Sequence, residues 1–293
     1  MSQLAFDQEF LRKLDRIALA SRTVVKGDTG GNRKSRSKGS SVEFSDFREY
    51  ARGDDFRRID WNAYGRFERL FVKLFMEERD AVVSLFIDCS RSMDWGRPNK
   101  GVLAKQLAAV LAYLSLANFD RVAVAACNDT LLSNLPALSG KGNFWRLLQY
   151  LEGLPFEGKT ALSRSIRSYP SLGGRGGISV VISDLFSKDD YREGLKYLQY
   201  KRQEVILLHL LAPQELEPDF EGSIRLLDRE GEEPREVQVT PHVLKAYGRV
   251  LEAFIREKKE FCHNRGIQYI PVSSGLSLDE LVFGSLFRLG IIR

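Results

Sequence analysis

The stretch AVVSLFIDCSRS, residues 81–92, decides the fold. Its first part, Ala81 to Asp88, is an almost unbroken apolar run that ends in a carboxylate, and such a run is typical of a strand buried on both faces of a sheet. Ser90 and Ser92 follow at alternate positions. Open α/β sheets bind their ligands where parallel strands end. One carboxylate and two hydroxyls at such an end can converge on a hard cation, and oxygen-only ligands favour Mg²⁺ or Mn²⁺ over zinc.

Strands and helices alternate after this stretch, which predicts parallel strands joined by helical crossovers. The pair Asn128-Asp129 reads as a turn into a short strand at 130–135, so we expect one antiparallel edge strand. The fold class is therefore α/β, with a doubly wound, mostly parallel sheet. The other expected strands are 121–127, 178–183, 204–211 and 267–272, and the expected helices are 100–118, 143–151, 161–168 and 189–199.

Residues 213–240 interrupt this alternation and predict an inserted β-hairpin, because two strand-like runs flank a turn-rich REGEEP segment. Thr240-Pro241 then supplies an N-cap and a first-turn proline for a long helix that ends before Gly266. After the strand at 267–272, the capping box Ser277 to Glu280 predicts a final helix.

Residues 1–80 read as an N-terminal extension, and residues 81–293 as the α/β domain. The extension begins with an amphipathic helix at 7–20 and continues with a flexible loop, Lys26 to Ser41, that has no apolar residue. Charged and aromatic residues then interleave from Val42 to Arg79, where we expect one strand, Arg69 to Phe75, among turns and short helical pieces. The Gly53-Asp54-Asp55 turn with Asp60 is read as pairing with neighbouring arginines rather than as a second acidic site.

The composition is that of an ordinary globular protein. Its 44 basic and 39 acidic residues give a net charge of +5, a mixed field that does not by itself indicate nucleic acid. Cys89, Cys127 and Cys262 contain no CxxC pair, which fits a reducing compartment. The charged N-terminus lacks the apolar core of a signal peptide, and Val102 to Phe119 is interrupted by polar residues. We expect a cytoplasmic protein with no transmembrane segment.

Two further oxygen donors are placed to complete the cation site. Thr160 lies in EGKTALSRSI, a glycine-led turn that opens a helix, and Asp184 follows the strand ISVVIS. Both reach the same sheet edge as Asp88 if the strands are parallel. The alternative for Asp88 and Ser90 is a strand-end turn that satisfies free backbone amides of the next helix.

Together, DCSRS after a buried strand, GKT before a helix and SD at the end of a later strand resemble the metal-ion-dependent adhesion site of the von Willebrand factor A domain. The resemblance implies that Asp88, Ser90, Ser92, Thr160 and Asp184 hold Mg²⁺ or Mn²⁺. It also implies an open coordination position that a partner's Asp or Glu fills. Two departures stand out, since Leu185 occupies a position where many relatives have glycine and Lys159 places a cation beside Thr160.

A second resemblance covers the chain from about Gly39 onward. The segments FREYARGDDFRRIDW (47–61) and LHLLAPQELE (208–217) are similar to a bacterial family called domain of unknown function fifty-eight. Its members are von Willebrand A-like proteins encoded beside MoxR-type AAA+ ATPases. The resemblance implies a non-enzymatic adaptor that works with such an ATPase in protein remodelling or complex assembly.

Two other functions remain as alternatives. Asp88 could act as the nucleophile of a phosphoryl-transfer enzyme, but folds of that kind place a second aspartate two residues later, where this chain has Ser90. The basic stretch Lys26 to Lys38 could bind nucleic acid or anionic lipid, and a solvated loop explains the same charges. Cys89 has no adjacent histidine to make it a nucleophile, and His209 reads as a core residue.

Overall fold

The structure is a computed structural model, and it describes residues 4, 6–27, 42–51, 56, 59–77, 82–118, 120–170, 172, 176–187, 189–220, 222–226 and 235–286. The chain divides into two compact units. Met1–Gly30 and Ala81–Arg293 form the first, and Gly31–Asp80 forms the second. Each unit is described by itself.

A six-stranded sheet forms the centre of the first unit, with the strand order β10-β7-β6-β3-β4-β5. Neighbouring strands are parallel except β4 and β5, which are antiparallel. This confirms the predicted fold class, including its one antiparallel edge strand. The strands are β3 (Val82–Asp88), β4 (Arg121–Cys127), β5 (Leu131–Ser139), β6 (Gly177–Ser183), β7 (Gln203–Leu211) and β10 (Gln268–Ser273).

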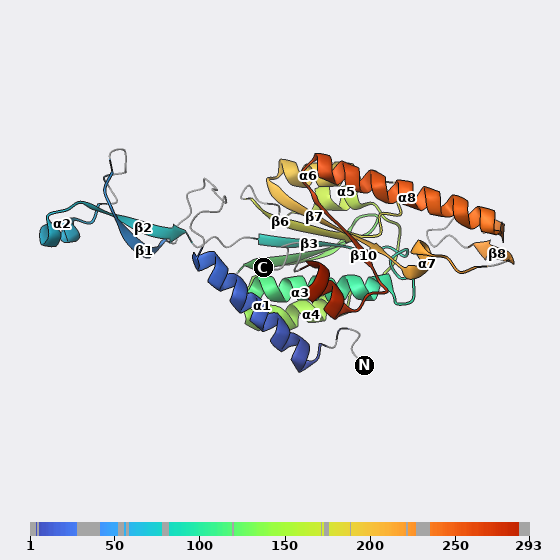
Figure 1. The fold of residues 1–293 in the computed structure, drawn as a ribbon, viewed down its shortest axis with the longest axis horizontal. Coiled ribbons are helices and arrows are strands. Elements are labelled where there is room, and N and C mark those ends of the chain that lie inside the picture. Colours follow the sequence, from blue (N-terminus) through green and yellow to red (C-terminus); the bar gives the residue numbers. More distant parts are fainter. Residues whose placement is uncertain are drawn as a thin grey trace. The chain divides into compact units, whose positions relative to one another are not determined.

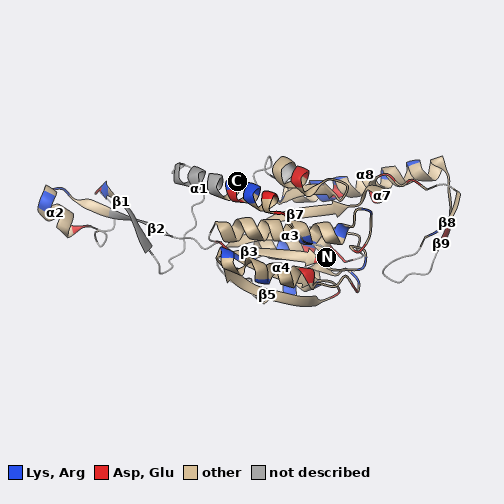
Figure 2. Ribbon diagram, turned by 90° about the horizontal axis from the view of Figure 1, so that it is seen from below, with Lys and Arg blue, Asp and Glu red and all other residues tan. Residues whose placement is uncertain are grey.

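Helices cover both faces of this sheet (Figure 1). Two buried apolar clusters, one on each face, result from this arrangement. One face carries α1 (Gln8–Gly27), α3 (Lys100–Ala117) and α4 (Phe144–Glu152), and the other carries α5 (Leu162–Ser168), α6 (Tyr191–Tyr200) and α8 (Pro241–Asn264). Lysine and arginine are interspersed with glutamate along α8 (Figure 2), as expected for a mixed charge distribution.

Helix α3 lies at the centre of one of these layers. It is long and apolar enough to cross a membrane by length and composition, contrary to the expectation that its polar residues exclude this. In the structure 83% of that helix is buried within the protein, and a buried core helix has the same composition. Its first turn is capped by Asn99, whose side-chain oxygen accepts a hydrogen bond from the Val102 amide at 3.1 Å.

The predicted insertion is present as a hairpin of β8 (Gly222–Leu226) and β9 (Arg235–Val239), preceded by the one-turn helix α7 (Pro213–Leu216). The Thr240 hydroxyl caps α8 by accepting a hydrogen bond from the Val243 amide. The Ser277 to Glu280 capping box is confirmed by reciprocal hydrogen bonds between the two residues. The helix that it opens, Glu280–Leu286, is a π-helix. A short 3₁₀ turn, Lys141–Asn143, precedes α4.

Helix α1 belongs to the first unit, which separates it from the rest of the N-terminal extension. Phe10 and Leu14 are buried in the apolar cluster that includes α3. The Asp15 carboxylate accepts a 2.8 Å hydrogen bond from the Tyr113 hydroxyl of α3. The apolar stripe that predicts an amphipathic helix therefore covers the α/β domain.

The second unit contains an antiparallel pair, β1 (Val42–Glu49) and β2 (Phe71–Glu77), and the short helix α2 (Trp61–Phe67). Strand β2 was expected within two residues, but β1 was expected to be irregular because charged residues obscure its alternation. Asp60 caps α2 by accepting hydrogen bonds from the amides of Asn62 and Ala63. The Gly53-Asp54-Asp55 turn lies outside the described residues, as does the flexible loop from residue 28 onward.

Candidate metal centre

Three loops carry the predicted ligands: two follow the neighbouring strands β3 and β6, and the third joins α4 to α5. Asp88 ends β3, which lies between β4 and β6 in the sheet. Asp184 directly follows β6, and Thr160 lies in the loop that leads into α5. The parallel strands therefore deliver both carboxylates to one edge of the sheet, as the sequence predicts.

Two backbone hydrogen bonds join the loop after β3 to the loop before α5. The Glu157 amide donates to the Cys89 carbonyl at 2.8 Å, and the Arg91 amide donates to the Gly158 carbonyl at 3.2 Å. Gly158 has a φ of 75°, a left-handed conformation that glycine adopts without steric cost. This turn places Thr160 in a chain segment held against Ser90 and Ser92.

The loop after β6 is tied to both of the others by serine hydroxyls. The Ser183 hydroxyl donates to Asp88 Oδ2 at 2.6 Å, and the Ser187 hydroxyl donates to the Thr160 carbonyl at 2.7 Å. All three loops are therefore cross-linked. Neither serine was singled out in the sequence, although Ser183 is the residue immediately before Asp184.

Asp88 lies at the centre of this arrangement and is fully buried. Its Oδ1 accepts a 3.0 Å hydrogen bond from the Ser90 amide, which lies within the loop, whereas the next helix, α3, is capped by Asn99. Burial, and then the negative charge of Asp184, raise the pKa of the Asp88 carboxyl from 3.8 to about 7. The Ser90 and Ser92 hydroxyl oxygens lie 3.0 Å apart.

Asp184 is also fully buried, and it has a partner that the sequence did not reveal. The Lys100 ammonium donates to Asp184 Oδ2 at 2.7 Å and to Glu215 Oε1 at 2.6 Å. The other oxygen of Asp184 accepts from the Phe186 amide at 3.1 Å. Lys100 opens α3 and is itself fully buried, whereas a lysine in a first helical turn is ordinarily expected to face water.

The two departures from the adhesion-site pattern have structural explanations. Leu185 has a φ of 57°, in the left-handed region, so a glycine there would remove backbone strain. The leucine side chain compensates by burial in the apolar cluster that contains α5 and α6. Lys159 is exposed, which places it on the solvent side of the loop rather than in the buried network around Asp88.

The donor set fits a hard divalent cation. Hydroxyl and carboxylate oxygens are the ligands that Mg²⁺ and Mn²⁺ prefer. Burial raises the pKa of Asp88 most and the negative charge of Asp184 adds to it, and a bound cation opposes both effects. Within the described residues no three His, Cys, Asp or Glu side chains gather as a metal-binding group, so any ion here depends on the serine and threonine hydroxyls.

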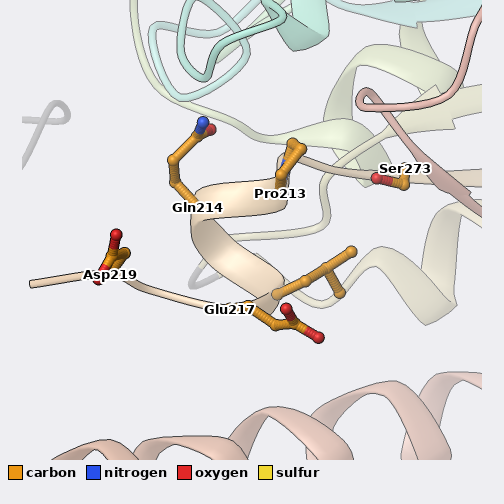
Figure 3. A pocket seen from close by; sticks show the side chains of 6 residues that line it. Pro213, Gln214, Glu217, Asp219 and Ser273 are labelled. Atoms are coloured by element: carbon orange, nitrogen blue, oxygen red, sulfur yellow. The ribbon is translucent and has the colours of Figure 1, made fainter.

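A surface cavity of about 390 Å³ lies beside α7, at the ends of β7 and β10 (Figure 3). None of the five predicted ligands lines it. It is therefore separate from the Asp88 cluster. Its lining residues are Pro213, Gln214, Leu216, Glu217, Asp219 and Ser273.

Two of the other residues considered in the sequence have clear environments. Burial, followed by the charge of Asp88, raises the pKa of the Cys89 thiol to about 12, which opposes a role as nucleophile. His209 is buried, with Nε2 3.0 Å from the Asp184 carbonyl oxygen and Nδ1 2.7 Å from the Tyr269 hydroxyl. It is a satisfied core residue that supports the backbone of the Asp184 loop.

The chain is similar to several known proteins. The uncharacterized protein Rv1480 of Mycobacterium tuberculosis (strain ATCC 25618 / H37Rv) is 25% identical over 254 residues, 84% of this chain and 79% of the relative. An aerotolerance-related membrane protein from Bacteroides fragilis is 19% identical with a TM-score of 0.44, covering 71% of this chain and 99% of that one. The SpRpn10 VWA domain is 12% identical with a TM-score of 0.32, covering 45% and 76%.

A family model matches residues 46–254, which is more than half of the chain. The matched region includes all five predicted ligands and the whole segment from Phe47 to Trp61 that suggested the resemblance. The chain therefore belongs to the family described as protein of unknown function DUF58.

Proposed function

We propose that the protein is a metal-ion-dependent protein-binding module. Its site holds Mg²⁺ or Mn²⁺ and presents that ion to a carboxylate of a partner protein. The α/β fold and the family suggest protein interaction as the general function. The cluster of Asp88, Ser90, Ser92, Thr160 and Asp184 supplies the chemistry for it.

The observation that carries the proposal is the mutual hydrogen bonding of three loops around two buried carboxylates. Asp88 and Asp184 are each 0% exposed, although carboxylates are almost never buried without compensation. Ser183 and Ser187 hold the loops together around them. Lys100 compensates the charge of Asp184, and a cation held beside Asp88 would supply the positive charge that Asp88 lacks.

The residues divide the work by their chemistry. The hydroxyls of Ser90, Ser92 and Thr160 are neutral donors to the ion, and Asp88 and Asp184 supply the negative charge that retains it. A divalent ion with neutral inner ligands keeps a strong attraction for an external carboxylate. The protein's own contribution is to fix these oxygens in a buried network before the partner arrives.

The family resemblance extends the proposal to the cellular context. We infer an adaptor that works in the cytoplasm with a MoxR-type AAA+ ATPase and has no catalytic activity of its own. The partner contributes an Asp or Glu side chain. If an ATPase encoded beside this protein binds it only in the presence of Mg²⁺ or Mn²⁺, that result would support the extension. If the two proteins still bind after EDTA removes the metal, that result would count against the metal dependence.

Calorimetric titration of Mn²⁺ and Mg²⁺ tests the site directly. The wild type is expected to bind one ion, and Asp88→Asn is expected to weaken binding by about 10- to 100-fold, the usual cost of removing a residue that orients or charges a metal site. Ser90→Ala is expected to act in the same direction. Ser168→Ala is a matched control, because that hydroxyl is exposed and bonds only locally to the Arg164 carbonyl.

Absence of binding by the wild type, or equal binding by Asp88→Asn, would refute the proposal. Hydrolysis of a generic phosphate ester that disappears in Asp88→Asn would instead support the phosphoryl-transfer alternative. Salt-dependent DNA binding that is lost on replacing Lys34 and Arg36 would support the basic-surface alternative.

A further inference from the structure

Lys100 is an unusual residue in its position, because it is a fully buried lysine next to a predicted metal ligand. Its ammonium lies between two carboxylates, 2.7 Å from Asp184 and 2.6 Å from Glu215. The ring centroids of Phe186 and Trp95 lie 5.3 and 5.9 Å from it. A buried charge is tolerated only when it is paired in this way.

Glu215 connects this ammonium to α7, outside the set of predicted ligands. One oxygen of Glu215 pairs with Lys100, and the other accepts a 2.7 Å hydrogen bond from the Ala212 amide. The Glu215 carbonyl accepts a further bond from the Tyr247 hydroxyl of α8. Glu215 is therefore held in place by its side chain and its backbone, and it shares the Lys100 ammonium with Asp184.

We propose that Lys100 is a fixed counter-charge of the metal centre, and that Glu215 sets how much of that charge acts on Asp184. The inference rests on the proposed function. It concerns the balance between the affinity of the site for a cation and the affinity of the bound cation for a partner's carboxylate. A positive charge bonded to Asp184 reduces the attraction of the site for a cation. It also leaves a bound ion less neutralised, so the ion attracts a partner's carboxylate more strongly.

This arrangement makes opposite predictions for two neighbouring substitutions. Lys100→Met removes the counter-charge, so Mn²⁺ should bind about tenfold tighter or more while the loaded site binds a carboxylate more weakly. Glu215→Gln removes the competing anion and leaves Lys100 to Asp184 alone. Mn²⁺ should then bind more weakly, and the loaded site should bind a carboxylate more strongly.

The experiment measures both affinities on the full chain. Calorimetry gives the Mn²⁺ affinity, and titration of acetate into the Mn²⁺-saturated protein gives the carboxylate affinity through the fall in water-proton relaxation as bound water is displaced. Lys100→Arg keeps the charge and is expected to resemble the wild type in both measurements. Thermal unfolding of each variant reports whether it is folded.

The inference is supported if Lys100→Met and Glu215→Gln shift the Mn²⁺ affinity in opposite directions and the acetate affinity in the reverse directions. It is overturned if both substitutions weaken Mn²⁺ binding alike, or if neither changes it, because a lysine with only a structural role gives those results. If Lys100→Met does not fold, the Mn²⁺ affinities of Glu215→Gln and of the double variant Lys100→Met/Glu215→Gln decide instead. The double variant is a milder change than Lys100→Met, because only Asp184 is left as a carboxylate without its cation. The inference then requires weaker Mn²⁺ binding by Glu215→Gln and tighter Mn²⁺ binding by the double variant than by Glu215→Gln.

The outcome is separable from that of the proposed function. If the wild type binds no Mn²⁺ but Lys100→Met does, the proposed function fails and Lys100 is shown to act as the resident cation of the site. If neither binds Mn²⁺, both the proposed function and the inference are rejected.

Discussion

Asp88 and Asp184 show how burial changes the chemistry of an ordinary side chain. The pKa of the Asp88 carboxyl is raised from 3.8 to about 7, so between these pH values the group is protonated more often in the folded protein than in the unfolded chain. The stabilisation that results is fully present below about pH 4 and is lost as the pH rises through about 7. The metal-free protein should therefore lose stability over this window because of Asp88.

Urea unfolding across that pH range checks this prediction by comparing the wild type with Asp88→Asn. The difference in the free energy of unfolding between the two proteins should change by up to ~1.4 kcal/mol per pH unit. The wild type should lose stability relative to the variant as the pH rises. Mn²⁺ should suppress the loss in the wild type. Parallel pH profiles without metal would show that Asp88 titrates in the folded protein as it does in the unfolded chain.

The cysteines give a second prediction at the residue scale. Cys89, Cys127 and Cys262 are all buried, and burial raises the pKa of each thiol, to about 12 for Cys89 and about 11 for Cys262. Since the thiolate is the reactive form, iodoacetamide at about pH 8 should not label the native protein. Mass spectrometry should find three modified cysteines after unfolding in urea. Rapid native labelling of one thiol would contradict its burial.

Among the structural elements, the loop before α5 is the one on which the site geometry depends most. Gly158 adopts a φ of 75°, and a Cβ there would lie 3.2 Å from the Asn128 side-chain nitrogen. Gly158→Ala should therefore cost about 1 kcal/mol of stability or more. It should also weaken Mn²⁺ binding, because Thr160 follows two residues later.

Gly248→Ala is a matched control for this glycine prediction. Gly248 lies within α8, and nothing approaches within 4 Å of the position that its Cβ would take. The substitution should stabilise the protein by about 0.5–1 kcal/mol, through helix propensity, and leave metal affinity unchanged. A loss of metal affinity in both variants would mean that the effect of Gly158→Ala is not local.

The sequence predicts the α/β elements well because their hydrophobic patterns are strong and long. Strand β3 and helix α3 are apolar enough to be recognised within one residue of their ends. Strand β1 was missed because its sequence, VEFSDFRE, carries four charges that resemble a loop. A bulge between Phe44 and Asp46 also breaks the alternation of apolar residues, so the strand becomes evident only from its pairing with β2.

The candidate site could be predicted only in part for a related reason. Asp88, Ser90 and Ser92 lie together in the sequence, and the parallel sheet carries Asp184 to the same edge. Lys100 and Glu215 could not be found this way, since they are 115 positions apart and meet only after folding. Neither the burial of a lysine nor its choice of partner has a local sequence signal.

At the scale of the whole molecule, the N-terminal helix stabilises a domain that begins some 50 residues later in the chain. Phe10 is 6% exposed and contacts the rings of Phe6 and Phe283, each with a centroid separation of 5.6 Å. Phe10→Ala should lower the free energy of unfolding by about 3 kcal/mol.

The exposed Arg12 of the same helix is the comparison for that prediction, and Arg12→Ala should change stability by less than about 0.5 kcal/mol. Denaturant unfolding followed by circular dichroism measures both. Equal, small effects would show that α1 contributes little to the stability of the α/β unit.

The strand order places β5 and β10 at the two outer positions of the sheet, and each carries an exposed proline, Pro136 and Pro271. A proline has no amide hydrogen, so it interrupts the row of donors that an incoming strand would need. Edge-to-edge aggregation is thereby opposed at both borders. For the same reason, recognition by β-augmentation is disfavoured at both borders of the sheet.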